Sequence, residues 1–234
     1  KVYDQMQSYS MVAIPMFVLM ANFLTHSKVA DGLFLSIRYL LGPLKGGLGL
    51  AVIVVSTVFA ATTGIVGVDT SSDTADGTTT SIAALSAARG ADGHISLREA
   101  ITAVNNTANG GTPDRIVFAI DGTGVHTITP TSALPSITEA VVLDASTDDS
   151  FAASANRPAV ILDGNNLAAD GLVLGATADG STIRGFVIRD FNLSGIWIQS
   201  GSDGNTIAGN YIGRLNTSGT DPGAGEGNGS AGIW

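Results

Sequence analysis

Residues 181–188, STIRGFVI, recur 24 positions later as residues 205–212, NTIAGNYI. Residues 171–174, GLVL, recur with the same step as residues 195–198, GIWI. Each segment is short and bounded by Gly, Asn or Asp, which commonly form the turns between strands. A period of about two dozen residues is typical of a solenoid whose coils stack on one another. The repeat predicts a parallel β-helix, because the leucine-rich-repeat alternative would need an L-x-x-L-x-L-x-x-N pattern that is missing.

Four further strands are expected before the repeat, at residues 115–120, 126–130, 140–145 and 159–164. The predicted β-helix therefore covers residues 115–234. The GIW motif returns at residues 232–234, so the preceding coil contains an insertion, and we expect the β-helix to be truncated at its C-terminus. The repeated glycines are expected to be structural, namely Gly171, Gly185, Gly195 and Gly209.

Residues 68–114 are expected to form an N-terminal cap with a short helix at about residues 96–105. Ser96 and Glu99 have the S-x-x-E spacing of a capping box. Leu97, Ile101 and Val104 follow on one helical face. Because the capping box explains Glu99, we predict a structural role for this residue.

The composition changes between Gly67 and Val68. All four methionines and all three lysines precede residue 68. Residues 1–67 carry four basic and two acidic side chains, whereas residues 68–234 carry seven basic and 18 acidic ones. The acidic half excludes nucleic acid as a partner, because phosphate binding relies on clustered Lys and Arg. The chain has no cysteine, which excludes disulfides and thiolate metal sites.

The first half is typical of a membrane sequence. Residues 48–68 contain no charge, and a stretch of about 20 apolar residues spans a bilayer. Residues 9–24 form a shorter uncharged segment with Pro15. Between them, residues 26–47 resemble an interfacial helix, with Lys28, Arg38 and Lys45 favouring the cytoplasmic side. The sequence thus predicts an N-terminal transmembrane α-helical segment in contact with the lipid bilayer; a signal peptide and a buried soluble hairpin are the alternatives.

The runs SYSMVAIPMFVLMANFLTHSKVADGLF (8–34) and LLGPLKGGLGLAVIVVSTVFAATTGIVG (40–67) resemble the large membrane subunit of tripartite ATP-independent periplasmic (TRAP) transporters. This resemblance implies sodium-coupled uptake of carboxylates, with a small periplasmic binding protein as partner. It also makes Thr63 and Gly64 candidate sodium ligands, because the matching family segment begins a re-entrant hairpin. The alternative for these small residues is helix packing.

Residues 68–234 resemble another family. ISLREAITAVNNT (95–107) and NTIAGNYIG (205–213) are similar to bacterial extracellular proteins in which a CSLREA segment precedes a pectate-lyase-like β-helix, with Ile95 in place of the cysteine. This resemblance implies that the parallel β-helix is right-handed. The chain therefore looks chimeric, with sequence missing at both ends. A natural fusion and an artificial joining of two genes both remain open.

Candidate catalytic residues are sparse in the acidic half. Asp148 and Asp149 form the one adjacent acidic pair there, which we interpret as part of a solvated loop. His94 and His126 lack a partner at metal-ligand spacing. Arg184 and Arg189 suggest a clamp for a sugar carboxylate, although a solvated sheet face is the simpler interpretation. We expect no catalytic activity and no cofactor besides the sodium that the transporter resemblance implies.

Three functions follow from these patterns. The first is a β-helix attached to the bacterial inner membrane, with residues 68–234 periplasmic or extracellular, that binds a glycan or cell-surface ligand or has a structural role. The second is a fragment of a TRAP permease subunit joined to a β-helix. The third is a polysaccharide lyase or hydrolase, which would need clustered carboxylates.

Overall fold

The computed structural model describes residues 64–221, 223, 225 and 227–234. These residues belong to a compact unit that begins at Ala60. The strands are β1 (Ile65–Val68), β2 (Asp114–Phe118), β3 (His126–Ile128), β4 (Val141–Asp144), β5 (Val160–Leu167), β6 (Leu172–Leu174), β7 (Thr182–Arg184), β8 (Phe186–Phe191), β9 (Ile196–Ile198), β10 (Thr206–Ala208) and β11 (Tyr211–Ile212). The helices are α4 (Ile82–Ala87), α5 (Leu97–Asn105), the 3₁₀ helix η1 (Ala145–Thr147) and α6 (Asp149–Ala153).

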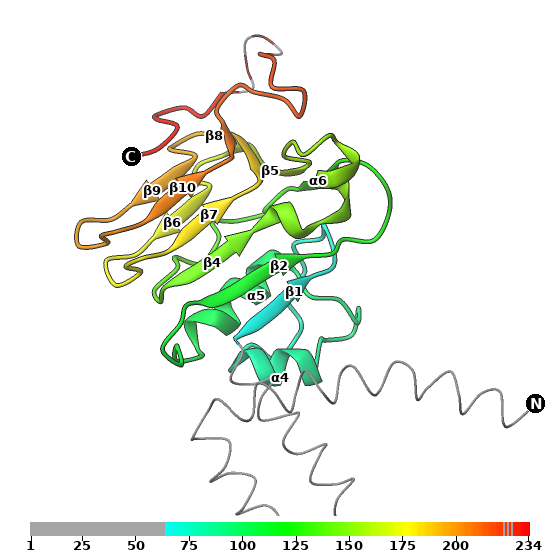
Figure 1. The fold of residues 1–234 in the computed structure, drawn as a ribbon, viewed down its shortest axis with the longest axis vertical. Helices are drawn as coiled ribbons and strands as arrows, with labels where there is room; N and C mark the ends of the chain where they lie inside the picture. Colours follow the sequence, from blue (N-terminus) through cyan, green and yellow to red (C-terminus); the bar gives the residue numbers. More distant parts are fainter. Residues whose placement is uncertain (1–63, 222, 224, 226) are drawn as a thin grey trace, which may run out of the picture. The chain divides into compact units, whose positions relative to one another are not determined.

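The strands form three parallel sheets (Figure 1). Their orders are β1-β2-β4-β7-β10, β11-β8-β5-β3 and β6-β9. In each sheet, one pair of neighbouring strands joins equivalent positions of the repeat identified in the sequence. Thr182 pairs with Thr206, Val187 with Tyr211, and Leu172 with Ile196. Equivalent positions in the sequence repeat therefore lie next to each other in space.

The strands that come earlier in the chain are not paired at this 24-residue separation. Ile65 pairs with Arg115, and Val142 pairs with Thr182, so these partners are much farther apart in the sequence than the repeat would place them. The long connections contain α4 and α5 before β2, and η1 and α6 after β4. The prediction of an all-β solenoid with one short capping helix is therefore wrong: the described residues form parallel sheets with several helices and uneven connections, and the regular step joins only the last strands.

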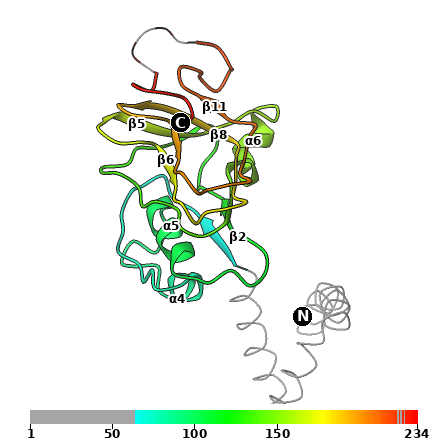
Figure 2. The same ribbon diagram turned by 90° about the vertical axis from the view of Figure 1, so that its left-hand side faces the viewer.

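The core at the N-terminal end of this unit forms where α5 packs on β1 and β2, with α4 beside it (Figures 1 and 2). The face of α5 that carries Leu97, Ile101 and Val104 is buried. Farther along the chain, the rings of Phe118 and Phe186 meet edge to face, with centroids 5.3 Å apart. Such aromatic pairs stabilise a core beyond the area that they bury.

The predicted transmembrane α-helical segment is also corrected. Among the residues that the structure describes, no helix has the length and apolar character that a bilayer crossing requires. Residues 65–68, the end of the predicted span 48–68, form strand β1 and pair with β2. The β-branched Ile65, Val66 and Val68 suit a strand, and Val66 and Val68 are buried there. The remainder of that span and residues 9–24 lie outside the described residues.

Candidate binding and metal sites

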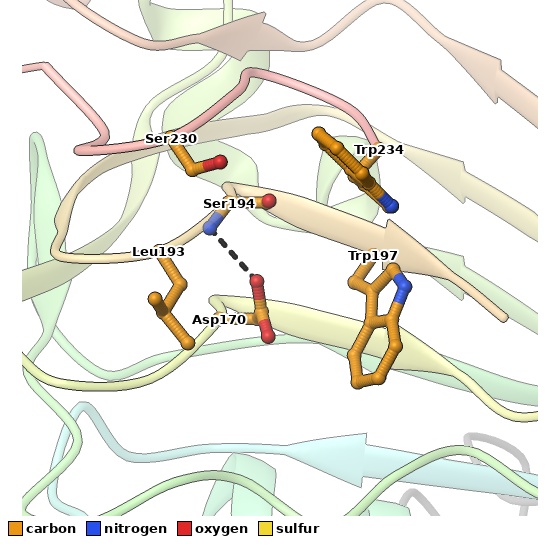
Figure 3. Close-up of a pocket in the computed structure, with 6 residues that line it drawn as sticks. All are labelled: Asp170, Leu193, Ser194, Trp197, Ser230 and Trp234. Carbon is orange, nitrogen blue, oxygen red and sulfur yellow. Dashed lines mark hydrogen bonds between the residues drawn. The ribbon is translucent and has the colours of Figure 1, made fainter.

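An open pocket of about 260 Å³ lies beside β6 and β9 (Figure 3). Its walls come from the turns before these strands and from two tryptophans, of which Trp197 is 36% exposed and Trp234 is 70% exposed. The lining residues are Asp170, Leu193, Ser194, Trp197, Ser230 and Trp234. Indole faces can stack on a flat ligand, and a carboxylate can accept hydrogen bonds from it.

Asp170 already has a structural partner at this pocket. Its Oδ1 accepts a hydrogen bond from the N–H of Ser194, the equivalent turn of the next repeat, at 2.8 Å (Figure 3). Asp179 accepts the N–H of Asp203 with the same step, and Asn205 accepts the N–H of Ser181. These turn side chains therefore connect successive repeats.

Arg184 and Arg189, the two arginines considered for a sugar-carboxylate clamp, contact aspartates of neighbouring strands. Arg184 on β7 binds the buried carboxylate of Asp144 on β4. Arg189 on β8 binds Asp163 on β5, with Nη2 and Oδ2 2.9 Å apart. Both guanidinium groups thus join adjacent strands, and this arrangement favours a structural role.

Two acidic side chains are held as carboxylates by such contacts. Burial raises the pKa of Asp144, but hydrogen bonds from Arg184 and Ser146 outweigh it, so the pKa is lowered from its ordinary value. Burial likewise opposes ionisation of Asp73, yet hydrogen bonds from Arg98 and Thr131 lower its pKa. Arg98 of α5 also donates to the carbonyl oxygens of Ser132 and Ala133, which ties this helix to the segment after β3.

Asp114 has the opposite electrostatic environment. Burial and the nearby charge of Glu139 raise its pKa to about 6. Its Oδ2 is buried and has no hydrogen-bond partner among the described residues. Gly64 approaches this carboxyl closely, because a Cβ at Gly64 would fall 1.8 Å from Asp114 Oδ1.

The candidate sodium ligands are only partly described. Thr63 lies outside the described residues. Gly64 has φ +54° in the turn before β1, and its carbonyl oxygen accepts the Arg115 N–H. This hydrogen bond belongs to the pairing of β1 with β2 and places Gly64 at the turn that begins β1. The sodium role of Thr63 and Gly64 stays a prediction.

The structural candidates lie in close contacts and tight turns. Ser96 and Glu99 form both hydrogen bonds of the capping box at α5. A Cβ on Gly171 would lie 2.4 Å from the Gly195 carbonyl oxygen, and a Cβ on Gly195 would lie 2.9 Å from that of Gly232. Gly185 and Gly209 both have positive φ.

One cluster escaped the sequence reasoning. His126 of β3, the buried Asp148 and the exposed Asp149 place ligand atoms within 4.8 Å of one another. The histidine and the acidic pair are separated in the sequence by the whole of β4 and its flanking turns, so no local motif connects them.

Comparison with known proteins identifies the first half. The family described as "Tripartite ATP-independent periplasmic transporter, DctM component" matches residues 1–119, which is half of the chain. The chain belongs to the DctM family. The match extends beyond the resemblance at residues 1–67 and includes β1, α4, α5 and β2.

A curated relative is the C4-dicarboxylate TRAP transporter large permease protein DctM of Rhodobacter capsulatus. It is 38% identical over 64 residues, which are 27% of this chain and 14% of the relative. The chain thus matches only a small part of that permease. No solved structure matches the chain. The comparisons give no support to the predicted similarity of residues 68–234 to CSLREA β-helix proteins.

Proposed function

We propose that the protein takes part in the uptake of C4-dicarboxylates as a portion of a TRAP large permease component. The observation that supports this function is the DctM match over residues 1–119. The similarity to the Rhodobacter capsulatus permease supports the substrate class, because that relative is named for C4-dicarboxylates. Membership of this family indicates an inner-membrane protein. The proposal assigns no catalytic reaction to the chain.

A periplasmic solute-binding protein is the proposed partner, since the family description refers to a periplasmic transporter. The described residues offer no support for a glycan ligand beyond the open tryptophan pocket. The position of residues 68–234 on the periplasmic side stays a prediction from Lys28, Arg38 and Lys45. Protease added to intact spheroplasts should cleave residues 68–234 if this position is correct, and protection of those residues would contradict it.

A segment exchange tests the transport proposal. In the Rhodobacter capsulatus permease, the region that corresponds to residues 1–67 is replaced by this chain's sequence, and uptake of labelled succinate is measured with and without a sodium gradient. We expect uptake to remain within a few-fold of the parent permease. Loss of uptake in a hybrid that still reaches the membrane would contradict the proposal.

Two threonine variants of the same hybrid test the cation site. Thr63→Val should weaken the sodium dependence of uptake, because hydroxyl oxygens suit sodium and a methyl group does not. Thr62→Val is the matched control, and it should leave the sodium dependence unchanged. Equal effects of the two substitutions would indicate that both threonines only pack against neighbouring segments.

A further inference from the structure

His126 is a buried side chain with an unused nitrogen. It begins β3, where its backbone N–H binds the Ala159 carbonyl oxygen at 3.0 Å. The side chain is only 9% exposed, and Nε2 has no hydrogen-bond partner among the described residues. Nε2 faces Asp148 Oδ1 across 3.7 Å, which is longer than a hydrogen bond. A buried polar atom without a partner is costly, so this nitrogen needs an explanation.

Asp148 is held firmly opposite this nitrogen. Its side chain is fully buried and caps α6. Oδ1 accepts hydrogen bonds from the N–H and hydroxyl of Ser150, and Oδ2 accepts the Ile120 N–H at 2.9 Å. Such contacts fix the direction of a carboxylate, as the outer partners of metal ligands do.

Asp149 completes the group from the exposed side. Its carboxylate lies within 4.8 Å of the ligand atoms of His126 and Asp148. From these observations we propose that His126, Asp148 and Asp149 bind a divalent transition-metal ion of the Zn²⁺ class. The site connects β3 to the start of α6. It lies beyond residue 119, outside the DctM match, and does not depend on the transport proposal.

The donor set selects this class of ion. A neutral imidazole nitrogen with two carboxylate oxygens suits Zn²⁺ and similar metals, whereas Ca²⁺ and Mg²⁺ take oxygen ligands. With Zn–ligand bonds of about 2.1 Å, tetrahedral ligand atoms lie about 3.4 Å apart. The 3.7 Å between His126 and Asp148 is close to that value. The exposed Asp149 can rotate to close the remaining distance, and water can take the fourth position.

A second histidine–aspartate pair provides a contrast within the same chain. His94 Nδ1 lies 3.4 Å from Asp69 Oδ1, and both side chains are partly exposed. Asp69 Oδ1 also accepts the Ile95 N–H, while Oδ2 accepts from Arg89. No second carboxylate joins this pair in a metal-ligand group among the described residues. We therefore expect metal binding at His126 and none at His94.

The test is a calorimetric titration of the metal-free full chain with Zn²⁺. Wild type should bind Zn²⁺ at this site, His126→Gln should lose that binding, and Asp149→Asn should bind at least tenfold more weakly. The controls His94→Gln and Asp203→Asn should bind as wild type does. Mg²⁺ or Ca²⁺ at equal concentration should not displace the Zn²⁺. Zn²⁺ should also raise the melting temperature of wild type and not that of His126→Gln.

Equal Zn²⁺ affinity of wild type and His126→Gln would overturn the proposal, as would the absence of Zn²⁺ binding by wild type. Tryptophan fluorescence checks folding, because both tryptophans of the chain, Trp197 and Trp234, lie in the described part. If His126→Gln does not fold, the Zn²⁺ affinity of Asp149→Asn tests the proposal, because the Asp149 side chain is exposed and its substitution should not disturb folding. Unchanged affinity in folded Asp149→Asn would reduce the cluster to an ordinary buried histidine–aspartate pair.

Discussion

At the residue scale, Gly185 and Gly209 occupy equivalent positions of the repeat but differ in their surroundings. Both have positive φ, at +84° and +65°. A Cβ on Gly185 would fall 2.4 Å from the Ser146 backbone nitrogen, while a Cβ on Gly209 would meet nothing within 4 Å. Gly209→Ala should therefore cost about 1 to 2 kcal/mol for backbone strain alone. Gly185→Ala should cost more than about 3 kcal/mol, because it adds a backbone clash. Urea unfolding followed by tryptophan fluorescence measures the free energy of unfolding of both variants. Equal losses of stability would contradict the backbone clash expected at Gly185.

A second residue-scale prediction concerns Asp114. Its folded pKa of about 6 exceeds the ordinary value of 3.8, so folding favours its protonated form. The stability that protonation provides is present below pH 3.8 and is lost as the pH rises through about 6. Asp114→Asn keeps the side-chain shape without the charge, and it should stabilise the protein at pH 7 by roughly 1 to 3 kcal/mol. The variant should gain little at pH 4, which is the internal control for this measurement. A gain independent of pH would show that the charge is not responsible.

At the element scale, Glu99 does more than cap α5. Oε2 accepts the Ser96 N–H, and Oε1 accepts the N–H groups of Asp76 and Gly77. Ser96→Ala removes one cap and should cost about 1 kcal/mol. Glu99→Ala leaves three N–H donors without their acceptor and should cost about 3 kcal/mol or more. Glu99→Gln, which keeps one oxygen, should fall between them. Thermal unfolding ranks the three variants, and a Glu99→Ala protein as stable as Ser96→Ala would contradict the role of Oε1.

The same elements show how far the sequence could predict the fold. The start of α5 depends on Ser96 and Glu99, which lie within one helical turn of each other, so local spacing identified it. The pairing of Thr182 with Thr206 follows from similar segments at a fixed step. The pairing of Ile65 with Arg115 joins distant segments of dissimilar sequence, and no period indicates it. For the same reason the cluster of His126 with Asp148 and Asp149 could not be predicted: chain folding, and no local motif, brings these residues together.

At the scale of the whole molecule, two groups of aspartates affect stability in opposite directions as the pH changes. Asp73 and Asp144 have lowered pKa values, so the stability that they contribute is present above pH 3.8 and is lost as the pH falls through those values. Asp114 has a raised pKa, and its contribution is lost between about pH 4 and pH 6. The net charge of −9 at pH 7 adds self-repulsion on the neutral side. Stability should therefore be greatest near pH 4 to 5.

Tryptophan fluorescence during urea unfolding of the full chain from pH 2.5 to pH 8 tests this profile. The free energy of unfolding should fall as the pH drops below 3.8, because Asp73 and Asp144, the buried partners of Arg98 and Arg184, then become protonated. It should fall by about 2 kcal/mol between pH 4.5 and pH 7, because Asp114 then ionises in a buried position next to Glu139. Asp114→Asn should remove most of the second fall and leave only the part that net-charge repulsion causes. It should leave the first fall unchanged, since Asp73 and Asp144 are untouched. A profile that is flat between pH 4.5 and pH 7 in wild type would instead mean that the Asp114 carboxyl is hydrated or paired in solution.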